Sequence, residues 1–451
     1  MRSSLVSRLE FLRPLALGLL LSTPIAMAAG SASALFLWSL DRITQTRWNH
    51  PWLLFLLPLA GLVMVWMYQR LGKKAERGTN LILDEIHQPG EGVPLRLAPL
   101  VLITTLLTHL CGGSAGREGT ALQMGGGLAG GFIRGFHIQE RHHRLLLQAG
   151  MAAGFSSVFG TPLAGAVFSL EVLTLGRIRH DYLIPCLWAA LIGDVTCSAW
   201  GIHHHHYTVA ALTPSVHWGF GTLDLLLLAK CLVAGVAFGW AARLFMEMTH
   251  GIQHLYQRYV LFPVLRPMLG GVIIIGLTLL LGTRAYLGLS VTSPNPGDVT
   301  LLSCFQSGGA TWNSWFWKLV FTAITLGSGF KGGEVTPLFF IGAALGNALS
   351  SILEVPTDFL AAMGFVAVFA GASNTPLACT LMGIELFGSG PAAYWAVGCG
   401  IAYLFSGQAS IYGSQRVDSH KIAGDPLPPG TSMADLHRQK TSAGTMPLKE
   451  K

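Results

Sequence analysis

The stretch CGGSAGREGTALQMGGGLAGG, residues 111–131, places two adjacent charges, Arg117 and Glu118, in a segment built mostly of glycine, small residues and apolar side chains. The chain around it is similarly apolar. Of its 451 residues, 51% are hydrophobic and 11% are charged, and the mean hydropathy is +0.52. Soluble domains carry about 25% charged residues. The composition therefore indicates an integral membrane protein, in which buried charges are costly and need a functional reason.

Long uncharged runs support this reading. Pro14–Leu40, Pro51–Tyr68 and Leu145–Leu170 contain no charged residue, and as helices each is long enough to cross about 30 Å of hydrocarbon. About a dozen such segments, many interrupted by Gly or Pro, predict an all-α, multi-pass protein of the cell's inner (plasma) membrane. The 29 Lys and Arg residues, against 22 Asp and Glu, are scattered at segment ends. That distribution is typical of membrane anchoring with a cytoplasmic N-terminus, and we expect no nucleic-acid partner.

The sequence repeats itself. TPLAGAVFSLE (residues 161–171) and TPLACTLMGIE (residues 375–385) share Thr-Pro-Leu-Ala and a Glu after six further residues. Upstream, Glu118-Gly-Thr120 and Glu334-Val-Thr336 are each followed by Leu, Gly and Gly at the same offsets. Helix packing explains shared small residues, but it does not explain matched Thr-Pro and Glu positions. We therefore expect two homologous transmembrane repeats, residues 1–206 and 207–417, as in many transporters. A short polar cytoplasmic tail, residues 418–451, is expected to be disordered.

The glycines around Glu118 suggest why the charges are there. Glycine breaks a helix and lets backbone approach an ion closely, and the new helix N-terminus carries free N–H groups that bind anions. A carboxylate at such a site can occupy it, block it, and leave when protonated. Glu118 would then be both a gate and a proton carrier. The alternative is an Arg117–Glu118 ion pair at a helix end in the headgroup region.

A second segment, GSGFKGGEVTPLFFIG (residues 327–342), has the same design. Its glycines precede an apolar run that begins with the N–H groups of Glu334, Val335 and Thr336. Two such helix ends, one from each half, could meet near the membrane midplane and point at one ion. Glu334 itself could carry a proton, or it could simply cap the helix.

Other chemistries find little support. Four consecutive histidines, residues 203–206, do not converge on one ion, and no Cys or carboxylate cluster accompanies them, so we expect no metal and no cofactor. The seven cysteines are dispersed. Neither an HExxH motif nor a Ser or Cys nucleophile motif stands out, so we do not expect an enzyme.

The motifs resemble those of one family. GREGT resembles the GREGP signature of CLC chloride channels and transporters, GGEVTP resembles the family's GGxFxP segment, and GTPLAGAVFSLEV resembles its NAPLAG–acidic segment. The resemblance implies the CLC fold, in which two inverted homologous halves contain broken and tilted helices. It also implies a homodimer in the lipid bilayer, with one pathway per subunit.

The departures from these signatures resemble the fluoride-exporting branch of the family. GTNLI (residues 78–82) replaces the first signature, so Thr79 stands where the family has an anion-coordinating serine, and Glu334 and Thr336 are gained in the third. The family's internal proton-transfer glutamate aligns with Val172, which leaves Glu171 as the only acid there.

By this resemblance the protein would export F⁻ from the cytoplasm in exchange for H⁺, with Glu118 and Glu334 carrying protons. Fluoride holds its water tightly, so its site must offer several strong donors. The expected anion-binding residues are Thr79, Gly116, Arg117, Gly119, Val335, Thr336 and Tyr412, with Tyr403 the less favoured choice for the pore tyrosine. The alternative function is a voltage-gated chloride channel or a Cl⁻/H⁺ exchanger of the same fold.

Overall fold

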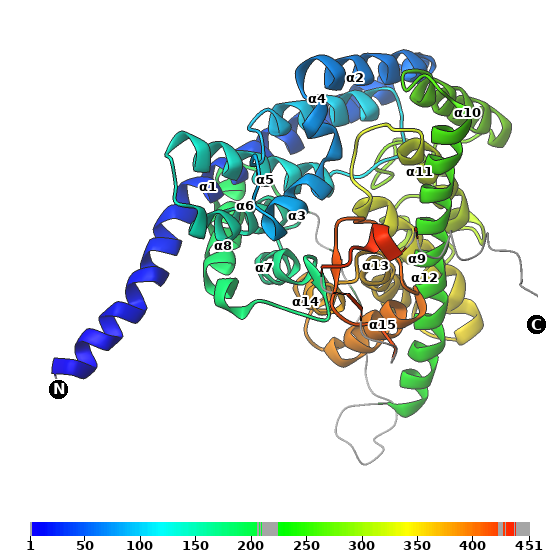
Figure 1. The fold of residues 1–451 in the computed structure, drawn as a ribbon. Coiled ribbons are helices and arrows are strands. Elements are labelled where there is room, and N and C mark those ends of the chain that lie inside the picture. Colours follow the sequence, from blue (N-terminus) through cyan, green and yellow to red (C-terminus); the bar gives the residue numbers. More distant parts are fainter. Residues whose placement is uncertain are drawn as a thin grey trace, which may run out of the picture.

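The computed structural model describes residues 2–204, 207, 209, 224–422, 427–428, 430–436 and 438, with the backbone alone for residues 2–12. The described residues are mainly helical (Figure 1). The first half contains α1 (Arg2–Asn49), η1 (Pro51–Leu56), α2 (Leu57–Leu71), η2 (Lys73–Arg77), α3 (Thr79–His87), α4 (Leu97–Leu110), α5 (Glu118–Gly135), η3 (Glu140–His142), α6 (His143–Phe159), α7 (Pro162–Glu171), β1 (Thr174–Leu175), η4 (His180–Tyr182) and α8 (Leu183–Ala199). The second half contains α9 (Leu225–Tyr259), α10 (Leu265–Leu281), η5 (Ser303–Phe305), α11 (Ser314–Gly327), α12 (Val335–Leu353), α13 (Thr357–Ser373), α14 (Pro376–Phe387), α15 (Ala392–Phe405) and β2 (Arg416–Val417). The predicted all-α, multi-pass fold is confirmed.

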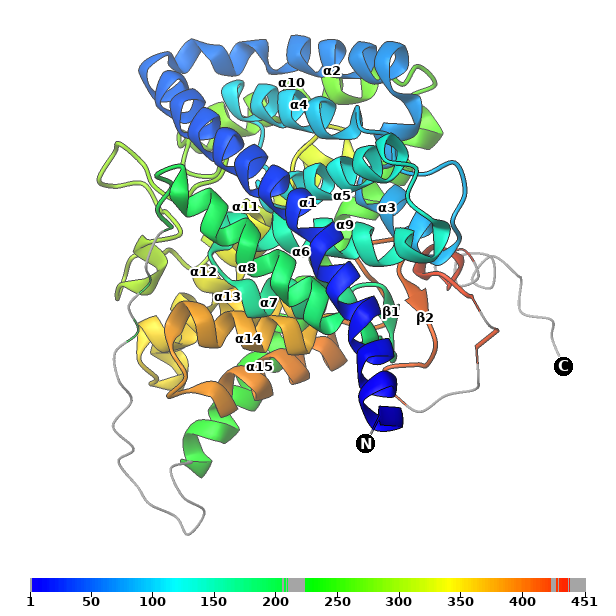
Figure 2. The same ribbon diagram turned by 90° about the vertical axis from the view of Figure 1, so that its left-hand side faces the viewer.

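The helices differ widely in length. Five described helical segments, within α1, η1–α2, η4–α8, α9 and α12, are long and apolar enough to cross a membrane. Other apolar helices, including α4, α13 and α14, have only 10–17 residues. The long α1 runs obliquely across one side of the molecule (Figure 2), where it packs on α4, α5, α6 and α8. Helices too short to span leave their ends inside the protein, where such ends can line a cavity.

One predicted crossing is wrong. The uncharged run Leu145–Leu170 is two helices, because α6 ends at Phe159 and α7 begins at Pro162. Gly160 between them has φ +69°, the left-handed conformation that ends helices, and proline then starts the next helix. The second half repeats this break, with Asn374 at φ +61° ahead of Pro376.

The repeated glutamates join the two halves. Glu171 at the end of α7 accepts hydrogen bonds from the N–H groups of Leu377 (3.1 Å) and Ala378 (2.8 Å), at the start of α14. Glu385 near the end of α14 accepts in turn from Leu163 (2.9 Å) and Ala164 (2.8 Å), at the start of α7. Each carboxylate satisfies N–H groups that a helix start leaves unpaired. The repeated Thr-Pro-Leu-Ala and Glu positions therefore form a pair of caps, in which the glutamate of each half caps the helix start of the other half.

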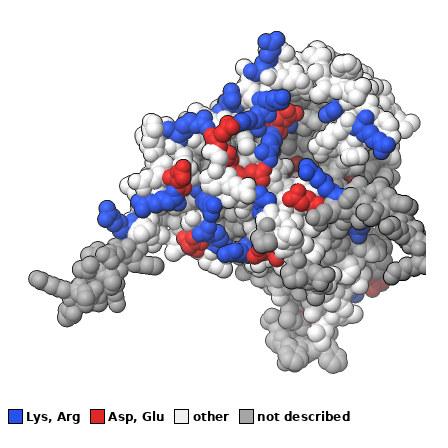
Figure 3. Space-filling model, viewed as in Figure 1, with Lys and Arg blue, Asp and Glu red and all other residues white. Residues whose placement is uncertain are grey.

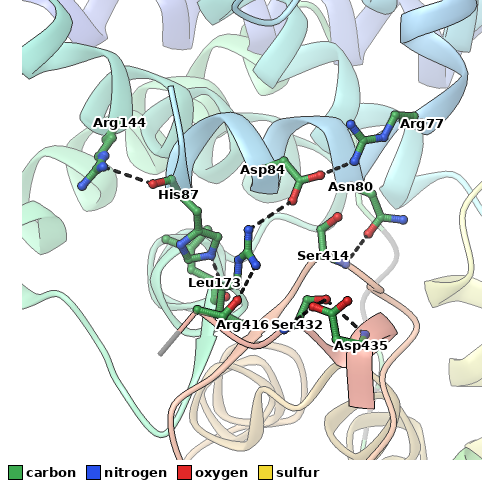
Figure 4. Close-up of polar contacts among 11 residues, drawn as sticks. Arg77, Asn80, Asp84, His87, Arg144, Leu173, Ser414, Arg416, Ser432 and Asp435 are labelled. Atoms are coloured by element: carbon green, nitrogen blue, oxygen red, sulfur yellow. Dashed lines mark hydrogen bonds and ion pairs between the residues drawn. The ribbon is translucent and has the colours of Figure 1, made fainter. Parts of the chain in front are cut away.

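The C-terminal segment folds back onto α3 (Figure 4). The Arg416 guanidinium lies 3.9 Å from the Asp84 carboxylate, and the Ser414 N–H donates to the Asn80 side chain at 2.9 Å. Backbone hydrogen bonds join residues 413–417 to residues 431–434. The expectation of a disordered tail from residue 418 is therefore wrong for its described part. That expectation used only the polar composition of the tail, which does not show its hydrogen bonds to residues earlier in the chain.

A small cap closes this segment. The Ser432 hydroxyl donates to the Asp435 carboxylate at 2.6 Å, the Ser432 N–H donates to it at 3.1 Å, and the Asp435 N–H donates back to the hydroxyl at 3.2 Å. These bonds hold the pKa of Asp435 below its ordinary value. The arrangement is a capping box, which begins a helical turn.

Candidate functional site

Two loops meet just before α5 and α12. Gly116 and Gly333 form an antiparallel bridge, in which each N–H donates to the other's carbonyl oxygen, at 2.6 Å and 2.9 Å. A Cβ on Gly333 would lie 2.8 Å from the Gly119 nitrogen and 3.3 Å from the Arg117 nitrogen, which is closer than packed atoms allow. The glycines beside the two acids therefore let two helix N-termini come together.

The Glu118 carboxylate lies at this junction. Glu118 begins α5 and is 1% exposed. Its Oε2 accepts from the Thr336 N–H at 3.0 Å and from the Arg117 N–H at 3.1 Å, and its Oε1 accepts from the Thr336 hydroxyl. The Arg117 Nε lies 3.5 Å from Oε1. Two amides, a hydroxyl and a guanidinium thus surround one carboxylate, and groups of this kind bind anions in general.

The surface ion-pair alternative for Arg117 and Glu118 does not fit this geometry. The two side chains are paired, but the Glu118 carboxylate is buried and also bound by Thr336, a residue 218 positions away in the sequence. The predicted meeting of the two helix starts is what the structure shows.

A small cavity of about 20 Å³ lies on one side of Glu118. That volume holds about one water-sized particle. Its polar lining includes Arg117, Glu118 and Thr336, and its apolar lining includes Phe159, Val291, Leu301 and Phe339. We call it the outer cavity.

A much larger cavity of about 1100 Å³ lies on the other side of the helix starts. We call it the inner cavity. Its lining includes Thr79, Gln123, Glu334 and Tyr412, together with the basic residues Lys73, Arg77, Arg266, Lys331 and Arg438. Lys and Arg are numerous on the face viewed in Figure 3, with Asp and Glu interspersed among them. The two cavities therefore differ greatly in volume, and the larger one has the basic lining.

Three predicted residues line the inner cavity. Glu334 holds the N-cap position of α12 and lines the inner cavity, and its side chain makes no capping hydrogen bond. The Thr79 hydroxyl accepts from the Gln123 amide at 3.3 Å and keeps its own hydrogen to donate. Tyr412 is 3% exposed and lies near both acids.

The structure thus divides the predicted residues into two groups. Gly116, Arg117, Glu118, Gly119, Val335 and Thr336 lie at the junction of the helix starts, and Thr79, Glu334 and Tyr412 face the inner cavity. The alternative tyrosine, Tyr403, instead lies beside Lys421, with the ammonium 4.4 Å from its ring centroid.

Some site residues were not predicted. Gln123 is the lone amide in the glycine-rich α5, and that isolation was a usable signal. His204 and Tyr207 line the outer cavity, and the sequence had given them no role in the site. His205 and His206 lie outside the described residues. Among the residues that the structure describes, no cluster of three or more His, Cys, Asp or Glu could hold a metal ion.

Comparison with known proteins finds similarity to chloride channel proteins in both the family models and the individual sequences. The family model described as "Voltage gated chloride channel" matches residues 60–407. The chain is 45% identical over 445 residues to a "Chloride/fluoride channel protein" of Pseudomonas syringae pv. tomato, covering 97% of this chain and 95% of that protein. It is 29% identical over 359 residues to a "Putative chloride channel protein ClcB-like" of Ralstonia nicotianae, covering 74% and 78%.

Solved structures show the same fold. One, a CLC-type fluoride/proton antiporter, superposes with a TM-score of 0.83 at 33% identity, covering 89% of this chain and 98% of that one. Another, a slow cyanobacterial Cl⁻/H⁺ antiporter, gives a TM-score of 0.72 at 18% identity, covering 95% and 98%. The second likeness concerns the fold alone.

Proposed function

The chain belongs to the voltage-gated chloride channel family, and from this premise we propose that it is a fluoride/proton antiporter that exports F⁻ from the cytoplasm. The relative with 45% identity is described as a chloride/fluoride channel, and the structural neighbour with 33% identity as a fluoride/proton antiporter. Both descriptions support fluoride as the transported anion.

One observation carries the proposal. The Glu118 carboxylate occupies the donors that Arg117 and Thr336 offer. A carboxylate and a halide would compete for these donors, since both are anions and the donors are few. Protonation of Glu118 removes its charge and weakens its hold, so anion binding and proton binding are linked at one site. Such linkage is what antiport requires.

The donors suit a small, strongly hydrated anion. The Thr336 hydroxyl and N–H already bind an oxyanion, while the hydroxyls of Thr79 and Tyr412 face the inner cavity. A site that accepts fluoride must replace its tightly held water with several strong donors. Glu334, when protonated, would add one more donor.

The direction follows from charge and shape. Basic residues favour the cytoplasmic side of a membrane protein, so the inner cavity with its Lys and Arg lining faces the cytoplasm. Glu118 takes up a proton from the outer side. F⁻ then enters from the inner cavity, displaces the protonated side chain, and leaves through the outer cavity. Glu118 then returns and delivers its proton inward, with Glu334 as the inner carrier. The inward proton gradient of the plasma membrane drives the cycle.

Flux measurements in liposomes test this proposal. Purified protein is reconstituted, and F⁻ efflux and H⁺ uptake are recorded with ion-selective electrodes, with Cl⁻ as the competing anion. We expect F⁻ efflux that drives H⁺ uptake, and Glu118→Gln should abolish the H⁺ flux because an amide cannot exchange a proton. Proton coupling that survives this substitution would contradict the role of Glu118. Faster Cl⁻ than F⁻ efflux would favour the chloride alternative.

We also expect two copies to associate, each with its own pathway. Large apolar side chains on α8 and α14 are exposed: Ile184, Val195 and Leu377 have exposed fractions of 55%, 63% and 55%. Single-molecule photobleaching in liposomes would count the subunits, and monomers that transport at full rate would contradict a required dimer.

A further inference from the structure

Lys318 is a charged side chain that the proposed cycle does not use. It lies in the second turn of α11 and is 0% exposed. Its ammonium donates to the carbonyl oxygens of Tyr286 (3.2 Å) and Gly288 (2.7 Å) and to the Ser290 hydroxyl (2.9 Å). An ammonium has three donors, so all of them bind one loop, the segment between α10 and α11.

This lysine has no acidic partner. No described carboxylate lies within ion-pair distance of its ammonium. Burying an unpaired charge is costly, and an apolar side chain of similar volume would serve packing at less cost. The terminal nitrogen is instead held by three hydrogen bonds to one loop, which satisfy its donors without an ion pair.

The loop that Lys318 holds reaches the outer cavity. Ser290 has φ +57°, an uncommon left-handed conformation that persists only where its surroundings hold it. The carbonyl oxygen of Ser290 accepts from the Leu301 N–H at 2.7 Å. Val291, the next residue, and Leu301 both line the outer cavity beside Glu118. The lysine thus holds the turn that places two apolar side chains against the anion site.

We propose that Lys318 is a positioning residue for the outer gate: its ammonium holds residues 286–291 so that Val291 and Leu301 keep the outer cavity closed while Glu118 occupies the anion site. The inference rests on the proposed function, because a gate matters only if an anion passes Glu118. Loss of the ammonium would release the turn, open the outer cavity, and let fluoride leak without a proton.

The test uses the full chain in liposomes. Lys318→Met removes the ammonium and keeps an unbranched side chain, whereas Lys318→Arg keeps a charged donor. Lys230→Met is the matched control, since the Lys230 ammonium donates to the Glu354 carbonyl oxygen at 3.3 Å but is only half-buried and lines neither cavity. Val291→Ala enlarges the gate directly while Lys318 stays in place. The readouts are passive F⁻ leak without a proton gradient, and the number of protons exchanged per fluoride.

We expect Lys318→Met to raise the leak at least about tenfold, because it removes all three hydrogen bonds to the loop and the loss of even one bond of this kind shifts an equilibrium by about that factor. The same substitution should lower the proton-to-fluoride ratio. Val291→Ala should do the same, Lys318→Arg should lie between Lys318→Met and wild type, and Lys230→Met should match wild type. A merely structural lysine would reduce yield and rate without changing the ratio.

Three results would overturn the proposal. Lys318→Met could fold and keep both the wild-type leak and ratio. Val291→Ala could raise the passive F⁻ leak while Lys318→Met keeps the wild-type leak. If Lys318→Met does not fold, a Lys318→Arg protein indistinguishable from wild type together with a tight Val291→Ala would count against the gate. Should wild type show no coupled fluoride flux, the proposed function fails, and comparing Cl⁻ leak in the same variants still tests the lysine.

Discussion

Replacing Thr336 with valine would remove one donor from the anion site and leave the rest of it nearly unchanged. Valine has almost the shape of threonine, and the backbone N–H of residue 336, which lies 3.0 Å from the Glu118 carboxylate, is retained. Only the hydroxyl bond to that carboxylate is lost. A hydrogen bond to a charged group is worth about 1.5–3 kcal/mol. We therefore predict that fluoride affinity falls about ten- to hundredfold, since each 1.4 kcal/mol is about a factor of ten.

The measurement needs the site free of its own carboxylate. In a Glu118→Ala background the side chain no longer competes, and calorimetric titration of the purified protein with fluoride reports the affinity of the remaining donors. Adding Thr336→Val to that background isolates the hydroxyl. The affinity for chloride, titrated in the same way, should fall less, because chloride is larger and depends less on short hydrogen bonds.

Thr120→Val is the matched control. Thr120 holds the position in the first half that Thr336 holds in the second, and it is equally buried. Its hydroxyl lies 2.8 Å from that of Thr105 and does not bind the Glu118 carboxylate. Equal affinity losses in the two valine variants, or no loss in either, would refute the reasoning that the Thr336 hydroxyl is a ligand.

Two further predictions concern stability. Gly333→Ala should abolish folding or transport, because its Cβ would lie 2.8 Å from the Gly119 backbone nitrogen. The control is Gly390→Ala, which should behave as wild type because nothing lies within 4 Å of its Cβ. A normal elution profile and flux for Gly333→Ala would contradict the close approach. Glu385→Gln should destabilise the protein by about 1.5–3 kcal/mol, because a neutral amide binds the start of α7 less well than a carboxylate. Thermal unfolding in detergent would show this, with exposed Glu247→Gln as its control; equal melting temperatures would argue against the cap.

Much of the site was predictable because its chemistry is local. Glycines beside an acid and a Thr-Pro at a helix start act within a few residues, so GREGT and GGEVTP could be read as interrupted helices without knowing the fold. The internal repeat then predicted that the two interruptions correspond. The family resemblance on these motifs is confirmed, and so is the helical membrane fold.

Other features could not be read because they depend on partners far along the chain. Glu171 and Glu385 appeared as a repeated acid, but that each caps the other's helix is a contact across 206 and 222 positions. Lys318 looked like any base near a segment end, and its three acceptors lie 28 to 32 positions away. The run Leu145–Leu170 met the length rule for a crossing, although one left-handed glycine divides it.

The sequence by itself determined the class of protein, the places where helices break, and the kinds of groups at the proposed anion site, because these follow from composition and from conformational limits of single residues. Only the tertiary structure decided which donors face Glu118, which cavity is large and which small, and which side chains hold the loops around them. Those outcomes depend on how helices pack over distances of hundreds of residues, and packing is a property of the whole chain.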